Sequence, residues 1–164
     1  MNVAISVPNF NIVNSTLLDS KKNIITTDGI FTKIIYSTPL FIMNGIFFYF
    51  PITVDNIINS NGRFFINFNP NFKNNSLIIR DISNIEEHIL DFYKKTNLVD
   101  KNKTLLLKNQ LNTGNIKVYK DTNDNLTNTN FTNKQFILKI SGIWENKFDF
   151  GITYKIIVAT HIDY

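Results

Sequence analysis

Residues 139–145, Lys-Ile-Ser-Gly-Ile-Trp-Glu, and residues 151–156, Gly-Ile-Thr-Tyr-Lys-Ile, decide the fold class of this chain. They lie within two segments, 136–145 and 151–160, in which apolar residues alternate with Lys, Ser and Thr. Such alternation is typical of β-strands, because successive side chains of a strand point to opposite faces of the sheet. The short segment between the two predicts a turn, so together they are expected to form a β-hairpin.

The alternation divides the side chains of this hairpin between two faces. The apolar face is predicted to hold Phe136, Leu138, Ile140, Ile152, Tyr154, Ile156 and Val158. Lys139 and Lys155 fall on the opposite face, with Ser141 and Thr153. Trp144 has the parity of the apolar residues, which favours the core, whereas its place at a strand end favours a groove, and both placements stay open. A sheet face with basic and aromatic side chains suits single-stranded nucleic acid.

Residues 138–146, LKISGIWEN, and residues 150–156, FGITYKI, resemble single-stranded DNA-binding proteins of large eukaryotic DNA viruses. Further similar blocks, which extend the resemblance over most of residues 31–160, are 34–39, 41–46, 105–111 and 116–119. The resemblance implies an OB-fold that binds single-stranded DNA through its groove without reading sequence, in viral DNA replication, repair or recombination. It also implies self-association.

The composition permits such a function but does not require it. The 164 residues and the 43% hydrophobic content predict one folded domain with a substantial core. The net charge of +4, from 17 basic and 13 acidic residues, is mildly basic. Asn, Ile, Lys and Phe are abundant and have A/T-rich codons, which indicates an AT-rich genome. The preference for Lys over Arg therefore says little about function.

Several classes of protein are excluded or disfavoured. The chain has no Cys, so disulfides and zinc sites built on thiolates are excluded. Residues 1–5 lack a basic region followed by an apolar core, so no secretory signal is expected. The longest apolar run, residues 46–50, is too short to span a bilayer. We therefore expect an intracellular protein at the site of viral DNA replication, with no membrane partner.

No motif indicates catalysis. His88 is next to Glu87 in a predicted helix, where adjacent side chains point apart and do not converge on a metal, and His161 lies near the end of the chain. Ser141 is not part of a Gly-x-Ser-x-Gly elbow, and the glycines form no phosphate-binding loop. We predict a protein that is not an enzyme and uses no metal, cofactor or small-molecule substrate. An enzyme with an untypical site is the weakest alternative.

The order of the remaining elements predicts a mainly β fold with one helix. The expected strands before the hairpin are 31–36, 40–50, 63–68, 77–80, 104–111 and 116–120. The helix is expected over about 84–96, because Ser83 is a good N-cap and Glu86 completes a capping box. Residues 1–30 are read as an N-terminal arm with one strand near 24–25.

Residues 31–164 are predicted to form a single domain, in which 121–134 is a mobile loop. This pattern favours an OB-like barrel, closed or partly closed, with additional strands. A β-sandwich is the alternative.

Basic and aromatic residues of these strands are the candidates for nucleic-acid binding. The full set is Tyr36, Arg80, Lys108, Lys117, Tyr119, Lys139, Trp144 and Lys155. Lys117 and Tyr119 share one face of a strand, opposite Ile116 and Val118, although an ordinary solvated face has the same pattern. The expected partner is single-stranded DNA, with RNA left open. The main alternative is a virion structural or protein-interaction β-sandwich, with the apolar residues 46–50 as its interface.

Overall fold

The computed structural model describes residues 4–22, 28–120 and 134–160, and its centre is a long hairpin. Strands β10 (Lys134–Glu145) and β11 (Asp149–Thr160) pair antiparallel along their whole length. The register shifts between Ile140 and Gly142, so that Ser141 is the extra residue of a β-bulge. Before the bulge Ile140 faces the core, and after it Ile143 does. The bulge therefore moves Trp144 to the opposite face of the sheet, away from the core.

Two strands pair with each side of this hairpin. The partners of β10 are β3 (Ile30–Ser37) and β5 (Ile46–Tyr49), both antiparallel. The partners of β11 are β8 (Asn102–Thr104) and β9 (Asn115–Lys120), both parallel. Short strands extend the sheet from β3: β1 (Ser15–Leu17), β2 (Lys21–Lys22) and β4 (Ile42–Met43). The hairpin β6 (Asn56–Ser60) and β7 (Arg63–Asn67) extends it from β9.

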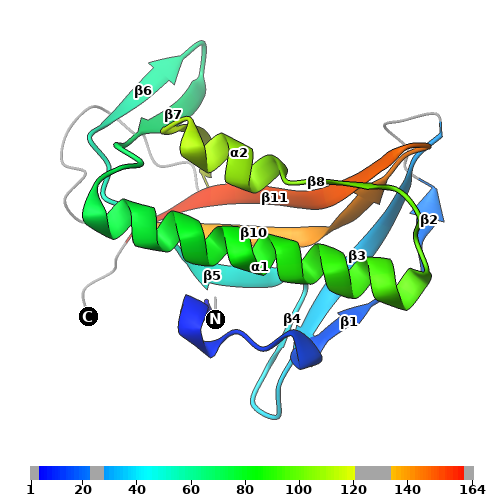
Figure 1. Ribbon diagram of the computed structural model, residues 1–164. Coiled ribbons are helices and arrows are strands. Elements are labelled where there is room, and N and C mark those ends of the chain that lie inside the picture. The colour runs from blue at the N-terminus through cyan, green and yellow to red at the C-terminus, as the bar shows by residue number, and fades with distance from the viewer. Residues whose placement is uncertain (1–3, 23–27, 121–133, 161–164) are drawn as a thin grey trace.

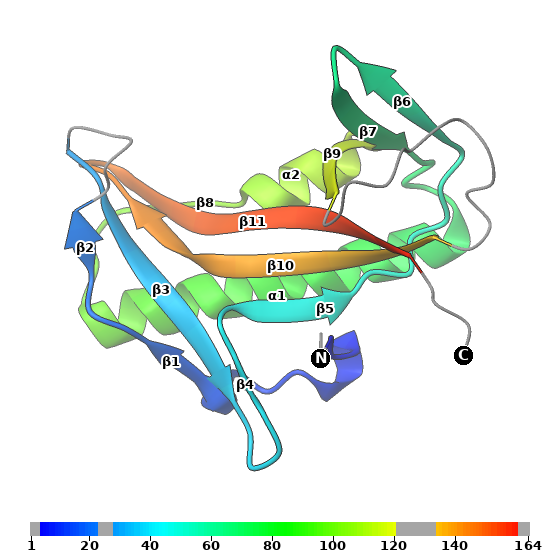
Figure 2. The same ribbon diagram turned by 180° about the vertical axis from the view of Figure 1, so that it is seen from behind.

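The sheet is covered on one face by α1 (Lys73–Asn97), as Figure 1 shows. The helix buries an apolar stripe that includes Ile82, Ile89 and Leu90 against strand residues such as Leu138 and Ile156. The short helix α2 (Leu106–Asn112) lies beside α1. Two 3-10 turns, Val7–Asn9 and Ile12–Asn14, precede β1. In the view from behind, β3, β5, β10 and β11 lie in front of α1 (Figure 2).

The prediction of a mainly β chain is confirmed, and the helix expected over about 84–96 lies within the longer α1, but the OB-like barrel is not confirmed. The described strands form one open sheet with the order β1-β3-β10-β11-β9-β7-β6, and its two end strands do not pair with each other. Part of the N-terminal arm belongs to the sheet, because β1 and β2 pair with β3. The predicted strand near 24–25 and residues 121–133 of the predicted loop lie outside the described residues.

Two predicted strands are wrong, and both are helical. Residues 77–80 lie inside α1, and the segment 104–111 is the end of β8 followed by α2. The capping box is also wrong, because Ser83 lies in the middle of α1 and its hydroxyl donates to the carbonyl oxygen of Ile79 at 2.6 Å. None of the helices in the described ranges is long and apolar enough to cross a bilayer.

Candidate functional site

The sheet face opposite α1 gathers basic and aromatic side chains, and we call it the open face. Strand alternation and register place on it Phe31, Lys33, Phe47, Tyr49, Phe65, Lys117, Tyr119, Lys139, Trp144, Thr153 and Lys155. All of these residues are half-buried or exposed, whereas their neighbours on the α1 side are largely buried. The open face therefore has the composition of a surface that can contact both phosphates and bases.

A lysine pair lies at the centre of the open face. Lys139 and Lys155 are directly opposite each other on β10 and β11. On the other side of β10, Phe47 is the register partner of Lys139, and the ammonium of Lys139 lies 4.8 Å from the centre of its ring. The Lys139 ammonium therefore lies toward β5, on the side of β10 away from Lys155. The two lysines place their positive charges next to each other along the open face.

Two aromatic rings of the open face lie over glycines. A Cβ atom on Gly142 would come 2.6 Å from Cζ of Phe31, and one on Gly151 would come 2.9 Å from Cζ2 of Trp144. The absence of side chains at these two positions lets the rings lie close to the sheet backbone. Both rings are half-buried, so part of each remains accessible.

A hollow of about 220 Å³ lies at the β9 side of the lysine pair. It is lined by Phe65, Gln110, Ile116, Lys117, Tyr119, Tyr154 and Lys155. Tyr119 is 42% exposed, and the ammonium of Lys117 lies 4.5 Å from the centre of its ring. Burial, aided by the charge of Glu86, raises the pKa of Tyr154 to about 12, so this phenol is a neutral hydrogen-bond donor at physiological pH.

The comparisons with known proteins add no relative to this geometry. No protein-family model, curated protein or solved structure matches the chain. The functional interpretation of the open face therefore depends on its residues.

Most of the predicted binding residues come together on the open face. The residues that lie there are Lys117, Tyr119, Lys139, Trp144 and Lys155. The bulge at Ser141 explains why Trp144 lies on this face although its parity in the sequence is that of the apolar residues. The prediction that Tyr154 shares a face with the apolar residues agrees with its pairing to buried Ile140, although the ring is only half-buried.

The other predicted binding residues do not lie on the open face. Tyr36 is only 1% exposed, and its hydroxyl accepts hydrogen bonds from the backbone of Asn11 and the side chain of Asn14. It is a core residue. Arg80 and Lys108 line a different hollow, of about 380 Å³, between α1 and α2, where Arg80 is paired with Asp81 at 2.9 Å.

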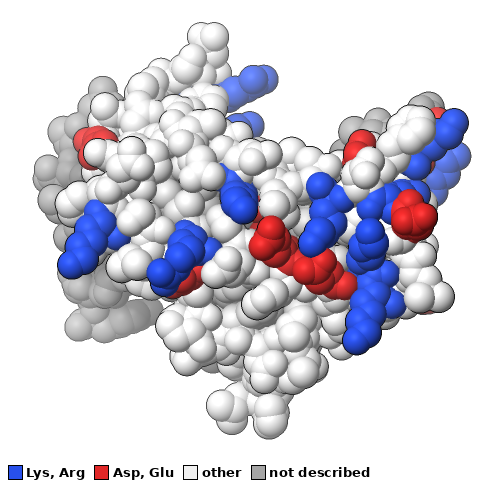
Figure 3. All heavy atoms as spheres, in the orientation of Figure 1, with Lys and Arg blue, Asp and Glu red and all other residues white. Residues whose placement is uncertain are grey.

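The face that carries α1 is less suited to a polyanion than the open face. Figure 3 shows its Lys and Arg side chains in separate groups around a central band of Asp and Glu. Ion pairs between α1 and the following segment contribute to this mixture, for example Lys103 with Asp91 at 2.5 Å. Among the residues that the structure describes, no group of three or more His, Cys, Asp and Glu side chains could hold a metal ion.

Several residues of the open face were not predicted from the sequence. Phe31, Lys33, Phe47, Tyr49 and Phe65 were not among the candidates. The signal was present, because Phe31 and Lys33 alternate with the buried residues of β3. Pairing β3 and β5 with the C-terminal hairpin would have brought them to the same face.

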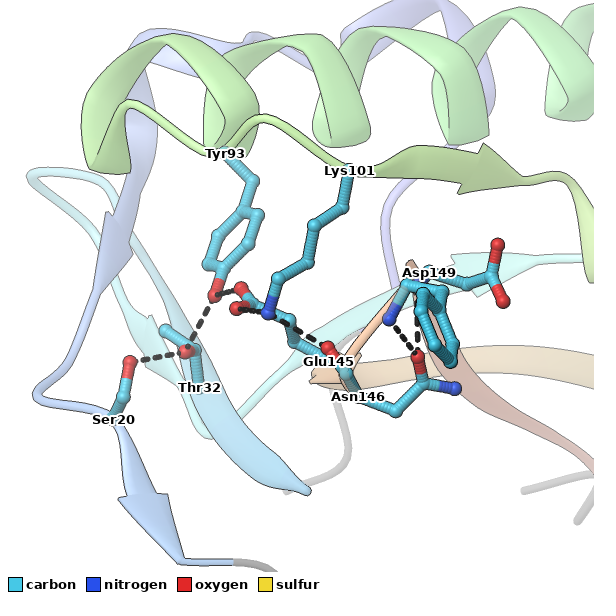
Figure 4. Close-up of polar contacts among 8 residues, drawn as sticks. Ser20, Thr32, Tyr93, Lys101, Glu145, Asn146 and Asp149 are labelled. Carbon is cyan, nitrogen blue, oxygen red and sulfur yellow. Dashed lines mark hydrogen bonds and ion pairs between the residues drawn. The ribbon is translucent and has the colours of Figure 1, made fainter. Parts of the chain in front are cut away.

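A chain of polar contacts fixes the end of β10 next to Trp144 (Figure 4). The hydroxyl of Tyr93, on α1, donates to Glu145 at 2.8 Å and also contacts Thr32 of β3 at 3.3 Å. Glu145 is paired with Lys101, whose ammonium also donates to the carbonyl oxygen of Asn146 at 2.7 Å. Burial raises the pKa of Tyr93, so its phenol stays protonated as this contact requires. The contacts join α1, β3 and β10 on the side opposite the open face.

Proposed function

We propose that this protein binds single-stranded DNA through the open face and does not read its sequence. The observation that carries the proposal is the lysine pair Lys139 and Lys155, placed in direct register and flanked by accessible aromatic rings. Phosphate contacts position a nucleic acid without regard to sequence, and every base offers a flat surface to an aromatic side chain.

Each part of the open face has a role in this proposal. The ammonium groups of Lys33, Lys117, Lys139 and Lys155 would neutralise phosphates of the backbone. The rings of Phe31, Phe47, Tyr119 and Trp144 would stack with bases. Stacking contributes about 1–3 kcal/mol per base, so a few such contacts are enough for useful affinity.

The proposal does not depend on a closed barrel. The resemblance to viral OB-fold proteins suggests binding in a groove. The proposal keeps one element of the OB-fold, a sheet whose strands contact the nucleic acid with their side chains. The described sheet is open, so the same chemistry would act from a sheet face. A role in viral DNA replication, repair or recombination follows from the resemblance and is part of the proposal.

Fluorescence anisotropy with labelled oligothymidine tests the proposal. If four lysines contact phosphates, the logarithm of the association constant should fall with the logarithm of salt concentration with a slope of about −2 to −3. Trp144 is the only tryptophan and is half-buried on the open face, so its emission should change on binding. A duplex of the same length is the matched control. Equal affinity for duplex and single strand, or no binding at low salt, would contradict the proposal.

A protein-interaction module is the second candidate, and one observation favours it. Leu40 and Ile42, in the β3–β4 hairpin, are 90% and 74% exposed. Of the interface expected at residues 46–50, only Phe47 and Tyr49 are accessible, because Ile46, Phe48 and Phe50 are fully buried. Absence of DNA binding together with association that is lost in Leu40→Ser/Ile42→Ser would favour this candidate.

A further inference from the structure

The hollow beside the lysine pair occupies a gap in the sheet. The register of β8 with β11 ends at Gly151, and the register of β9 with β11 begins at Ile156. Among the described residues, no strand pairs with this side of β11 between those two positions. Tyr154 lies within the gap, and α2, which contributes Gln110, lies next to β11. The gap gives the sheet an opening at the edge of the open face.

Two polar groups in the hollow are suited to a ligand. The Tyr154 hydroxyl makes no hydrogen bond with any residue that the structure describes, although the ring is half-buried. The Gln110 side chain uses its Nε2 to donate to the carbonyl oxygen of Asn115 at 2.7 Å, which leaves its amide oxygen as an acceptor. The hollow therefore combines one donor and one acceptor with the aromatic rings of Phe65 and Tyr119.

We propose that this hollow takes one unstacked base of a strand bound to the open face, an inference that rests on the proposed function. The Watson–Crick edge of every base carries a donor next to an acceptor, which the Gln110 oxygen and the Tyr154 hydroxyl can satisfy. The hollow, of about 220 Å³, is smaller than the roughly 300–1,000 Å³ of pockets for drug-sized ligands, which suits a single base. Lys117 and Lys155 line the same hollow and would contact the phosphates of that nucleotide.

Anisotropy with three labelled oligonucleotides of equal length tests this inference: oligothymidine, oligodeoxyadenosine, and an oligomer whose internal sites are abasic. All three carry the same phosphates. The wild-type protein should bind oligothymidine and oligodeoxyadenosine each about tenfold more tightly than the abasic oligomer. Tyr154→Phe removes only the hydroxyl and should lower the ratio between oligothymidine and abasic affinity about fivefold. Tyr36→Phe removes a hydroxyl from the core and should leave the ratio unchanged.

The outcomes separate this inference from the proposed function. Equal affinity for oligothymidine and the abasic oligomer, with both bound in a salt-dependent way, would overturn the base site and leave phosphate binding intact. An unchanged ratio in Tyr154→Phe would also overturn it. Absence of binding to any of the three oligomers at low salt would overturn the proposed function and the inference together.

Discussion

The ring of Phe31 lies so close to the backbone of Gly142 that a Cβ atom on the glycine would come 2.6 Å from the ring's Cζ. The two residues are on neighbouring strands, β3 and β10, and the contact is on the open face. A side chain at position 142 would also meet the carbonyl oxygen of Thr32. Glycine at this position therefore determines how near to the sheet an aromatic ring can lie.

Gly142→Ala should lower both stability and affinity. The new methyl group must displace Phe31 and the adjacent backbone, and such overpacking costs about 1–3 kcal/mol in the free energy of unfolding. Affinity for oligothymidine should fall because the ring moves. Gly62→Ala is the comparison: its φ of +75° makes alanine strained, but no atom lies within 4 Å of the added Cβ. Urea unfolding and anisotropy should show a stability loss in both variants and an affinity loss only in Gly142→Ala.

Replacing Lys139 and Lys155 together with Gln should weaken binding to all single-stranded sequences alike. The log–log salt slope should become less steep by about 1.4, since each phosphate contact with a single strand contributes about 0.7. Lys94→Gln/Lys95→Gln, in the last turn of α1, removes the same charge from the other side of the molecule and should leave the slope unchanged. An unaltered slope and affinity in the Lys139/Lys155 variant, with a slight gain in stability, would favour the interaction-module candidate.

Tyr119→Ala should reduce affinity without changing the melting temperature appreciably. The ring is 42% exposed, so little core packing is lost, whereas loss of a stacked base costs about 1–3 kcal/mol. Phe148→Ala removes an aromatic ring that is 64% exposed in the β10–β11 turn, outside the open face, and serves as the control. Equal affinities for the two variants would remove Tyr119 from the binding surface.

Stability should depend on pH through Glu86. Its buried carboxylate accepts the backbone N–H groups of Leu107 at 3.0 Å and Lys108 at 2.8 Å. Burial raises its pKa above the ordinary 4.5, and these two hydrogen bonds oppose the rise only in part. Because the folded state then binds the proton more tightly than the unfolded state, Glu86 contributes stability that is present below pH 4.5 and is lost as pH rises through the folded-state pKa.

The quantity to measure is the difference in the free energy of unfolding between the wild type and Glu86→Gln. Urea denaturation gives this difference at each pH from about 7 to about 4.5. The difference should shift in favour of the wild type as pH falls. Glu87→Gln, the next residue of the same helix, is the control for the loss of a carboxylate at this turn. A shift in the opposite direction would mean that the hydrogen bonds outweigh burial at Glu86.

Sequence alternation predicted the C-terminal hairpin well, because each strand there is long and buries one face. It could not predict the bulge at Ser141, since an extra residue in one strand leaves no compositional signal and reverses the parity that follows. Trp144 consequently has the parity of core residues in the sequence and the position of a surface residue in the fold. Lys139 precedes the bulge on β10, and Lys155 lies on β11, which has no extra residue, so alternation placed both on the same face correctly.

Local propensity was misleading where tertiary contacts decide the structure. Residues 77–80, Leu-Ile-Ile-Arg, have the composition of a strand, yet they continue α1 because Ile79 joins the buried stripe of the helix. The segment 106–112 has no cap of its own at its start, since Leu105 makes no side-chain cap. Its helical state depends on Glu86, which is 21 residues from Leu107 and invisible to local pattern.

This long-range cap also constrains the order in which the protein folds. A helix of seven residues does not persist alone in water, because nucleation costs more than so few hydrogen bonds return. The segment 106–112 should therefore become helical only after α1 has brought Glu86 to its N-terminus. Gln110 is part of that segment and forms one wall of the hollow, so this wall would be completed among the last steps of folding. It would also be among the first parts of the molecule to unfold locally.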